Sequence, residues 1–398
     1  MTRKLYLDDP YRLSFDGHIV QREETSDGFA VVLEETYFYP ESGGQPYDLG
    51  TIDGIPLRRI VERGEEVFHV LARMPEKDRV SCVVDGARRH EHMQQHSGQH
   101  ILSAAFIKEA NAQTLSFHLG SSTSTIDLDA TSLSPEALSA AEREANRAVR
   151  EAAPIRSYFV KPEEASRLKL RKAPEVEGIL RIVEVEGFDL QACCGTHPRN
   201  TSEVGPILIR GAERFKKGTR VGFVCGDRAL RDYRATVEKL RTLSQLFAAP
   251  EDKLVEAAEK LSEEKNTLRK TLQALREELI QHKAFRMAAD APAADGATIF
   301  LQRVGDVTPA ELRLLANCLT NEPGRIACLG CVADERAHLV FGRSSELTLD
   351  MAALLRQCLG AVEGKGGGSP QMAQGGGPNT SGLEAALAMA RRFLEGQE

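Results

Sequence analysis

Two pairs of potential metal ligands are the most informative residues of this chain. His96 and His100 lie four residues apart, and Cys193 and His197 repeat that spacing far downstream. Residues four apart share one face of a helix, so the two histidines could bind one ion, and a Gly-Thr turn could fold the second pair back onto it. Three imidazoles and one thiolate match a tetrahedral zinc site. We therefore predict Zn2+ as the cofactor, with these four residues as its ligands.

Two neighbouring residues keep the choice of ligands open. His92 lies one helical turn before His96, so it could replace His100 or orient a ligand from outside the metal shell. Cys194 could likewise take the place of Cys193. A lone HxxxH pair is weak support, because roughly a quarter of a match is expected at random from ten histidines in 398 residues, and two partly buried helix histidines are the alternative. No His-Glu-x-x-His motif is present, which disfavours a zincin protease.

The elements around these residues alternate between helix and strand. Residues 1–85 are rich in short strand patterns, and a helical pattern that carries both histidines begins at Asp85. Residues 115–128 read as a hairpin, and an Ala- and Glu-rich helix is predicted over residues 135–152. Further strands are predicted over residues 178–185, 204–209 and 220–224. The pattern indicates an α+β fold.

Changes in this pattern divide the chain into four predicted domains. They are a β-rich N-terminal domain (1–85), a zinc-binding α+β domain (86–227), a helical or coiled-coil linker (228–288) and a C-terminal α/β domain (289–398). In the linker, helices are predicted over 228–247 and 251–287. Leucines recur there every seven residues, at 254, 261, 268 and 275, which is typical of a coiled coil. A homodimer seam and an intramolecular antiparallel pair fit this repeat equally well, and the C-terminal domain is a second place for a homodimer contact.

The C-terminal domain contains two runs of three glycines, at residues 366–368 and 375–377. Such a segment could be a flexible linker, or it could be a backbone cradle for a phosphate or nucleotide. Strands are predicted over 297–301, 325–329 and 337–341, and helices over 308–320, 348–361 and 381–395. The glycine segment therefore lies between patterned elements, which makes the cradle at least as good an interpretation as the linker.

The bulk composition is that of a globular, multidomain protein. Of the 398 residues, 41% are hydrophobic and 27% are charged. The net charge of −7 argues against bulk attraction to nucleic acid or membrane, although a local basic face can still attract a partner. No signal peptide and no run of the ~18–20 apolar residues of a membrane span is visible. We expect a cytoplasmic protein with no membrane partner and with reduced cysteines.

Three separated motifs resemble parts of alanyl-tRNA synthetase. The segments HSGQHIL (96–102) and CCGTH (193–197) resemble the HxxxH and CxxxH zinc site of its editing domain. FYPESGGQP (38–46) looks like the FYPExGGQP loop of that domain, and residues 364–377 are similar to the GKGGG…AQGGG stretch of its C-terminal DHH-associated domain. The resemblance covers essentially the whole chain, in the expected order. The chain thus resembles the free-standing alanyl-tRNA editing proteins, the AlaX family, in their long form.

The resemblance implies an aminoacyl-tRNA deacylase, which is a carboxylic ester hydrolase. Its substrate would be tRNA(Ala) mischarged with serine, and in some members with glycine. Thr36 would be the hydrogen-bond partner of the serine hydroxyl, a partner left unpaired by alanine. Gln45 would be a second residue that contacts the aminoacyl ester. Whether the zinc is catalytic or structural stays open, because four protein ligands fill a tetrahedral shell.

Basic residues are the candidates for contacts with tRNA phosphates, and ordinary surface solvation is the alternative. They precede the metal helix, cluster within eleven residues downstream, or lie in the glycine segment: Arg88, Arg210, Arg214, Lys216, Lys217, Arg220 and Lys365. Three other functions fit part of the pattern. One is a non-catalytic tRNA-binding module with structural zinc. The second is a DHH-associated phosphodiesterase, although its Asp-His-His cluster is absent, and the third is editing of Ser-tRNA(Thr).

Overall fold

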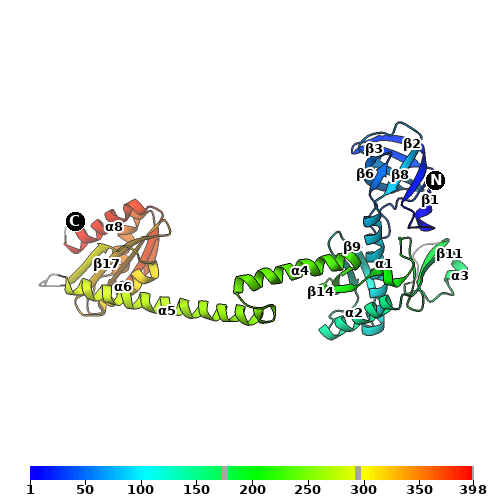
Figure 1. Ribbon diagram of the computed structural model, residues 1–398. Helices are drawn as coiled ribbons and strands as arrows, with labels where there is room; N and C mark the ends of the chain where they lie inside the picture. Colours follow the sequence, from blue (N-terminus) through cyan, green and yellow to red (C-terminus); the bar gives the residue numbers. More distant parts are fainter. Residues whose placement is uncertain (173–177, 292–296, 397–398) are drawn as a thin grey trace. The chain divides into compact units, whose positions relative to one another are not determined.

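The computed structural model describes residues 1–172, 178–291 and 297–396 (Figure 1). The chain separates into two units, Met1–Thr242 and Leu243–Glu398. The predicted domains 86–227 and 289–398 each include a few residues outside this description, and the four predicted domain boundaries stay a prediction. Both units mix helices and sheets, which confirms the predicted α+β class.

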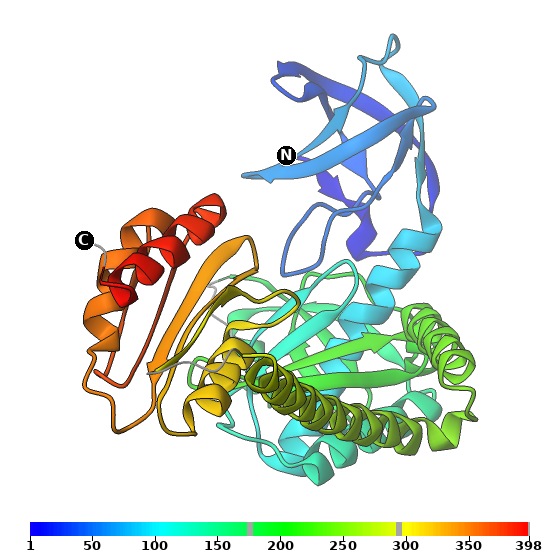
Figure 2. The same cartoon turned by 90° about the vertical axis from the view of Figure 1, so that its left-hand side faces the viewer.

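Six N-terminal strands close into a barrel, in the order β2-β3-β7-β6-β5-β8 (Figures 1 and 2). Their bounds are β2 Ser14–Thr25, β3 Gly28–Leu33, β5 Gly50–Ile52, β6 Ile55–Arg63, β7 Glu66–Leu71 and β8 Arg79–Val84. Strand β8 alternates exposed and buried residues along its whole length, as a strand with one buried face must. The inward side chains of the strands, among them Phe15 and Val31, form the barrel core together with Phe38 from the segment after β4. A short parallel pair, β1 (Arg3–Lys4) and β4 (Glu35–Thr36), accompanies the barrel.

Helix α1 (Gly86–Ala110) follows the barrel directly and carries both predicted histidine ligands. It begins where the Asp85 carboxylate accepts a hydrogen bond from the Arg88 backbone N–H at 3.1 Å, which is a normal N-cap. It ends at Asn111, whose left-handed conformation (φ 49°) closes the last turn. Its middle turns are buried, and most of their polar side chains have hydrogen-bond partners. Gln95, for example, bonds both the N–H and the C=O of Cys225, at 3.0 and 2.9 Å.

Two sheets and helix α2 (Pro135–Arg150) surround α1. One antiparallel sheet has the order β14-β15-β10-β9, and the other has the order β11-β12-β13. The strands are β9 Thr114–Leu119, β10 Ser124–Leu128, β11 Ile155–Val160, β12 Leu180–Val185, β13 Asp189–Ala192, β14 Ile207–Phe215 and β15 Gly218–Cys225. The short helix α3 (Pro162–Ala165) follows β11, and α4 (Gly226–Phe247) follows β15. The predicted hairpin and the helix at 135–152 are confirmed.

The prediction for residues 204–209 was wrong at its start. Residues Thr201–Val204 form a 3-10 turn, because the Asn200 side chain accepts the Glu203 backbone N–H at 3.3 Å. Gly205, at φ 69°, then redirects the chain before β14 begins at Ile207. Strands β11 and β13 were not predicted.

A buried ion pair joins α1 to the segment after β4. The Arg89 side chain, 1% exposed, pairs with the Asp48 carboxylate, which has no exposed area. Arg89 also donates to the carbonyl oxygens of Pro10, at 2.7 Å, and Tyr37, at 2.5 Å. Asp48 accepts the Tyr39 backbone N–H at 2.7 Å. The pair thus fixes the two ends of the 37–48 segment against the first turn of the helix.

The C-terminal unit is a five-stranded mixed sheet covered on both faces (Figure 2). The strand order is β16-β17-β18-β20-β19, with β16 and β17 parallel. Along β17, Ile326 and Cys328 pack toward α7 and α8, whereas Ala327 and Leu329 pack toward α5 and α6. The elements are α5 Leu254–Ala289, β16 Thr298–Arg303, α6 Pro309–Thr320, β17 Arg325–Ala333, β18 Arg336–Arg343, α7 Met351–Cys358, β19 Lys365–Gly368, β20 Met372–Gly377 and α8 Leu383–Leu394.

The glycine runs lie in the paired strands β19 and β20, so the flexible-linker interpretation was wrong. Close packing explains several of these glycines. A Cβ on Gly377 would lie 1.9 Å from the Val362 carbonyl oxygen, and one on Gly375 would lie 2.7 Å from the Leu359 side chain. A phosphate cradle along these strands stays a prediction.

The leucine repeat lies on one long helix, α5, and most of it faces solvent. Leu261, Leu268 and Leu275 are 56%, 69% and 57% exposed, whereas Leu254 is buried. Pairing of this seam with a second copy of the chain stays a prediction that sedimentation of the full chain would test. None of the described helices has the length and apolarity that crossing a membrane requires. All eight cysteines carry free thiols.

Removing Arg89 is expected to destabilise the N-terminal unit strongly. Arg89→Met leaves the Asp48 carboxylate buried without its partner, which typically costs about 3–5 kcal/mol of unfolding free energy. Chemical denaturation followed by circular dichroism measures the loss. The matched control is Arg59→Met, because Arg59 pairs with Asp27 at 2.8 Å on the barrel surface. Its cost should stay below about 1 kcal/mol. Equal costs for the two variants would contradict the role given to the buried pair.

Candidate metal centre

The four predicted ligands come together in the N-terminal unit. The ligand atoms of His96, His100, Cys193 and His197 all lie within 4.8 Å of one another. Helix α1 supplies the first two, and the loop after β13 supplies the others. The Cys193 Sγ lies 3.4 Å from Nε2 of His96 and 3.4 Å from Nε2 of His197. This cluster is the set that the two sequence spacings predicted.

The two alternative ligands lie outside the cluster. Among the described residues, neither His92 nor Cys194 joins a group that could hold a metal. Burial lowers the pKa of His92 to about 4, so its ring is neutral, and its Nδ1 has no hydrogen-bond partner in the described structure. Cys194 is exposed. The geometry therefore favours His100 over His92, and Cys193 over Cys194.

Each histidine of the cluster turns its Nδ1 outward onto a partner. Nδ1 of His96 lies 2.9 Å from Gln45 Oε1, and Nδ1 of His100 lies 3.0 Å from Asp189 Oδ2. The third contact joins Nδ1 of His197 to the Ser97 hydroxyl at 2.8 Å. With Nδ1 engaged in this way, Nε2 is the nitrogen available to an ion, as in most histidine metal sites.

Asp189 is itself held as an anion. Burial opposes ionisation of its carboxyl group, but the hydrogen bond with His100 and the charge of Arg171 outweigh burial and lower its pKa. Arg171 Nε donates to Asp189 Oδ1 at 2.8 Å. An ionised carboxylate only accepts, so Nδ1 of His100 carries a proton. Burial would lower the pKa of His100, but its hydrogen bonds with Asp189 and Cys193 outweigh burial and raise that pKa to about 9, so Nε2 must release a proton before it can bind an ion.

The loop after β13 is shaped to bring a thiolate to this cluster. Burial alone would raise the pKa of Cys193, but the neighbouring His96 and His197 outweigh it and hold that pKa well below its ordinary value. The Gly195 backbone N–H also donates to Cys193 Sγ at 3.3 Å. Gly195 must be glycine, because a Cβ there would lie 2.2 Å from the His96 ring. A thiolate with three imidazole nitrogens is a donor set that suits zinc.

A buried arginine fixes the same loop. Arg181, 5% exposed, donates from Nη1 to the carbonyl oxygens of Cys193 and Gly195, both at 2.9 Å. Sequence reasoning did not identify Arg181, Asp189 or Ser97. No spacing rule links Asp189 to His100 across 89 residues, so only the three-dimensional structure reveals the contact.

The two residues expected to meet the substrate are both fully buried. Gln45 lies in a tight turn in which Gly43 and Gly44 have φ values of 54° and 78°, and it contacts His96 directly. Thr36, at the end of β4, instead places its Oγ1 3.0 Å from Nε2 of His69 and accepts the Phe38 backbone N–H at 3.1 Å. The structure therefore brings Gln45, but not Thr36, into contact with the cluster.

Several of the predicted tRNA-binding residues already have partners. Arg210 pairs with Asp232 at 2.7 Å, and Arg220 pairs with Asp127 at 2.7 Å. Arg88 Nε donates to the Tyr47 carbonyl oxygen at 3.0 Å. The other four side chains are exposed. Within the described ranges they have no carboxylate partner: Arg214, Lys216 and Lys217 on the β14–β15 hairpin, and Lys365 on β19.

Two family models match the chain. The model of the threonyl and alanyl tRNA synthetase second additional domain matches residues 180–222, which include the Cys193 loop. The DHHA1 domain model matches residues 296–396 in the C-terminal unit. The C-Ala domain of Aquifex aeolicus alanyl-tRNA synthetase aligns with 26% of this chain and 97% of its own length, at 23% identity. Its TM-score of 0.25 is too low to support a conclusion about the fold.

Curated relatives extend the match over nearly the whole chain. The alanine–tRNA ligases of Methanopyrus kandleri and Pyrococcus furiosus are 31% and 32% identical over 96% and 94% of this chain. The chain spans only 43% and 42% of those ligases. The rat alanyl-tRNA editing protein Aarsd1 is 31% identical over 98% of this chain and 94% of its own length. With that match along nearly all of both sequences, and with both domain models in the expected order, this chain belongs to the family of alanyl-tRNA editing proteins.

Proposed function

We propose that the protein is a zinc-dependent deacylase that hydrolyses the ester of serine, and of glycine, on mischarged tRNA(Ala). The observation that carries this proposal is the buried cluster of three histidines and one cysteine, preorganised with its ligand atoms inward. Membership of the family whose rat member is named an alanyl-tRNA editing protein supports the substrate class.

Zinc, held by His96, His100, Cys193 and His197, would supply positive charge and Lewis acidity beside the ester. The chain's own residues would prepare that environment. The cluster is largely shielded from solvent, which strengthens electrostatic interactions inside it. Arg181 adds a second positive charge next to the Cys193 loop, where it donates to the carbonyl oxygens of Cys193, Gly195 and Leu7. A developing negative charge on the ester would be favoured there.

Thr36 would recognise the serine hydroxyl as a hydrogen-bond acceptor. Burial lowers the pKa of His69 to about 4, so its ring is neutral. Its Nδ1 lies 3.2 Å from the Val31 carbonyl oxygen, which can only accept, so Nδ1 carries the proton and Nε2 accepts from the Thr36 hydroxyl. With its hydrogen directed at His69, Thr36 has only a lone pair to offer a substrate. A serine hydroxyl could donate to it, and alanine could not.

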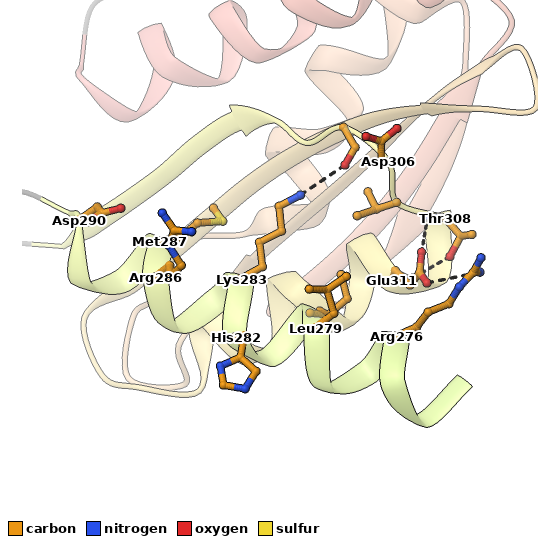
Figure 3. Close-up of a pocket in the computed structure, with 13 residues that line it drawn as sticks. Arg276, Leu279, His282, Lys283, Arg286, Met287, Asp290, Asp306, Thr308 and Glu311 are labelled. Carbon is orange, nitrogen blue, oxygen red and sulfur yellow. Dashed lines mark hydrogen bonds and ion pairs between the residues drawn. The ribbon is translucent and has the colours of Figure 1, made fainter. Parts of the chain in front are cut away.

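The tRNA would be held by exposed basic residues of both units. In the N-terminal unit these are Arg214, Lys216 and Lys217 on the β14–β15 hairpin. In the C-terminal unit Lys365 lies on the edge strand β19. The same unit has a groove of about 880 Å³ between α5 and the segment before α6 (Figure 3). Arg276, Lys283 and Arg286 line it together with three carboxylates, and Arg276 pairs with one of these, Glu311, at 3.7 Å. Lys283 donates to the Gly305 carbonyl oxygen at 3.3 Å. Such side chains suit phosphate contacts.

The ligand assignment predicts which variants lose zinc. His100→Ala and Cys193→Ala each remove a donor atom. Their zinc affinity should fall by more than the about 10- to 100-fold typical of losing an outer partner of a ligand. His92→Ala is the control and should bind zinc as the unmodified protein does. Competition with a chromophoric chelator measures all three affinities. Loss of zinc in His92→Ala, with retention in His100→Ala, would overturn the assignment.

The substrate proposal predicts the order of deacylation rates. Zinc-loaded protein should hydrolyse Ser-tRNA(Ala) and Gly-tRNA(Ala) faster than Ala-tRNA(Ala), with Ser-tRNA(Thr) as the control for the tRNA. Thr36→Val should lower kcat/KM for Ser-tRNA(Ala) by about 3- to 10-fold, the cost of one neutral hydrogen bond, and leave Gly-tRNA(Ala) nearly unaffected. Absence of hydrolysis of both mischarged tRNA(Ala) species would refute the proposed function and favour a non-catalytic binding module.

The basic residues should contribute to tRNA binding mainly through phosphates. Arg214→Ala, Lys217→Ala and Lys365→Ala should each weaken binding of tRNA(Ala) and reduce the slope of log affinity against log salt by about 1. The barrel-surface variant Arg59→Met serves as the charge-matched control and should change neither quantity. Filter binding at several salt concentrations gives both. Identical slopes for all variants would show that these side chains lie away from the tRNA.

A further inference from the structure

Gln45 connects three segments of the metal centre. It sits in the turn after β4, yet its side chain reaches the helix α1 and the loop after β13. Its Oε1 lies 2.9 Å from His96 Nδ1 and 3.1 Å from the Thr196 backbone nitrogen. Its Nε2 lies 2.8 Å from the Thr196 hydroxyl. No part of Gln45 is exposed.

These contacts determine which ring nitrogen of His96 carries its proton. The Thr196 backbone N–H can only donate, so the Gln45 atom that meets it must be the carbonyl oxygen. That oxygen can only accept, so His96 must carry its proton on Nδ1. Nε2 of His96 is then the nitrogen left to bind an ion, and it lies 3.4 Å from Cys193 Sγ, inside the cluster. In the other tautomer, His96 would present a proton to the ion.

The Gln45 amide has little capacity left for a substrate. Both lone pairs of its oxygen are used, by His96 and Thr196, and one of its two N–H hydrogens is directed at the Thr196 hydroxyl. A substrate contact would therefore have to break an existing bond or use the single remaining hydrogen from a buried position.

The turn that carries Gln45 is itself held tightly. Gln45 and Ser42 exchange two backbone hydrogen bonds, at 2.9 and 3.3 Å. The Tyr39 hydroxyl donates to the Ser42 carbonyl oxygen at 2.9 Å. Gly44 packs against Phe117, because a Cβ at Gly44 would lie 2.6 Å from that ring. The Gln45 side chain is thus presented to His96 by a fixed backbone.

We propose that Gln45 is a positioning residue that fixes the tautomer and orientation of His96 for metal binding, and not a contact of the aminoacyl ester. The assignment rests on the proposed zinc centre and changes the role that the family resemblance implied for Gln45. It also makes the barrel, through this one side chain, a part of the metal centre.

Two substitutions of similar size separate the two roles. Gln45→Met removes both the acceptor and the donor, and should weaken zinc binding about 10- to 100-fold, as loss of an outer partner of a ligand typically does. Gln45→Glu should bind zinc at least as tightly as the unmodified protein. Its carboxylate can accept from both His96 and the Thr196 N–H, while the Thr196 hydroxyl can turn to donate. Chelator competition on the full-length protein gives the affinities, with circular dichroism as the check on folding.

A second readout is specific to positioning. Long-range 1H–15N NMR of histidine-labelled apoprotein should show His96 protonated on Nδ1 in the unmodified protein and in Gln45→Glu. Gln45→Met should lose that single tautomer. If Gln45→Met does not fold, Thr196→Val provides the test, because it keeps the N–H that fixes Oε1 and should retain both the tautomer and most of the zinc affinity.

The outcomes separate the two proposals. Unchanged zinc affinity and an unchanged His96 tautomer in Gln45→Met, together with loss of Ser-tRNA(Ala) hydrolysis in both Gln45 variants, would overturn the positioning role and leave the deacylase intact. Weak zinc binding in Gln45→Met with rescue in Gln45→Glu supports positioning, even where no tested tRNA is hydrolysed. A protein that binds no zinc before substitution would overturn both.

Discussion

The buried pair of Arg89 and Asp48 is the constraint on which the candidate metal centre depends. Arg89 belongs to the first turn of α1 and Asp48 to the segment that leads back into the barrel, so the pair sets the distance between the two. Asp48 also accepts the Tyr39 backbone N–H. The Tyr39 hydroxyl donates to the Ser42 carbonyl oxygen, and Ser42 and Gln45 exchange backbone hydrogen bonds. One buried charge pair is therefore connected to a histidine of the cluster through an unbroken series of hydrogen bonds. A weak surface pair could not impose such geometry, because solvent would compete with it.

The second constraint is the difference in charge among the three groups that contact the histidine Nδ1 atoms. Asp189 is charged and paired with Arg171, whereas Gln45 and Ser97 are neutral. A carboxylate at Nδ1 makes Nε2 a stronger electron-pair donor to a metal than an amide or hydroxyl does. His100 should therefore be the most basic of the three predicted histidine ligands. The centre thus combines one strongly polarised imidazole with two weaker ones and a thiolate. That asymmetry would give a bound ion ligands of unequal strength.

Sequence reasoning found the parts of this centre that follow local rules. The i, i+4 spacing identified all four residues of the cluster because a helix and a turn place such residues on one side, and the repeats of apolar residues located most helices and strands. It failed where the deciding contact is distant in sequence. Asp189 and Arg181 have no local signal, because their partners are set by the register of the β11-β12-β13 sheet. The glycine runs left the linker interpretation open because their signal is purely local. Composition alone does not distinguish a linker from strands whose neighbours leave no space for a Cβ.

The separation of the ligands along the chain has a consequence for biosynthesis. Cys193 lies 97 residues from His96, and Thr196 lies 151 residues from Gln45, so the centre consists almost entirely of long-range contacts. Loops of this length are closed late, after local elements have formed. During translation the barrel and α1 emerge first. The two predicted ligands on α1, His96 and His100, then have no thiolate partner until the CCGTH segment leaves the ribosome. Uptake of the ion would then have to wait until synthesis has passed His197, and its binding energy would be available while β14, β15 and α4 are still joining the unit.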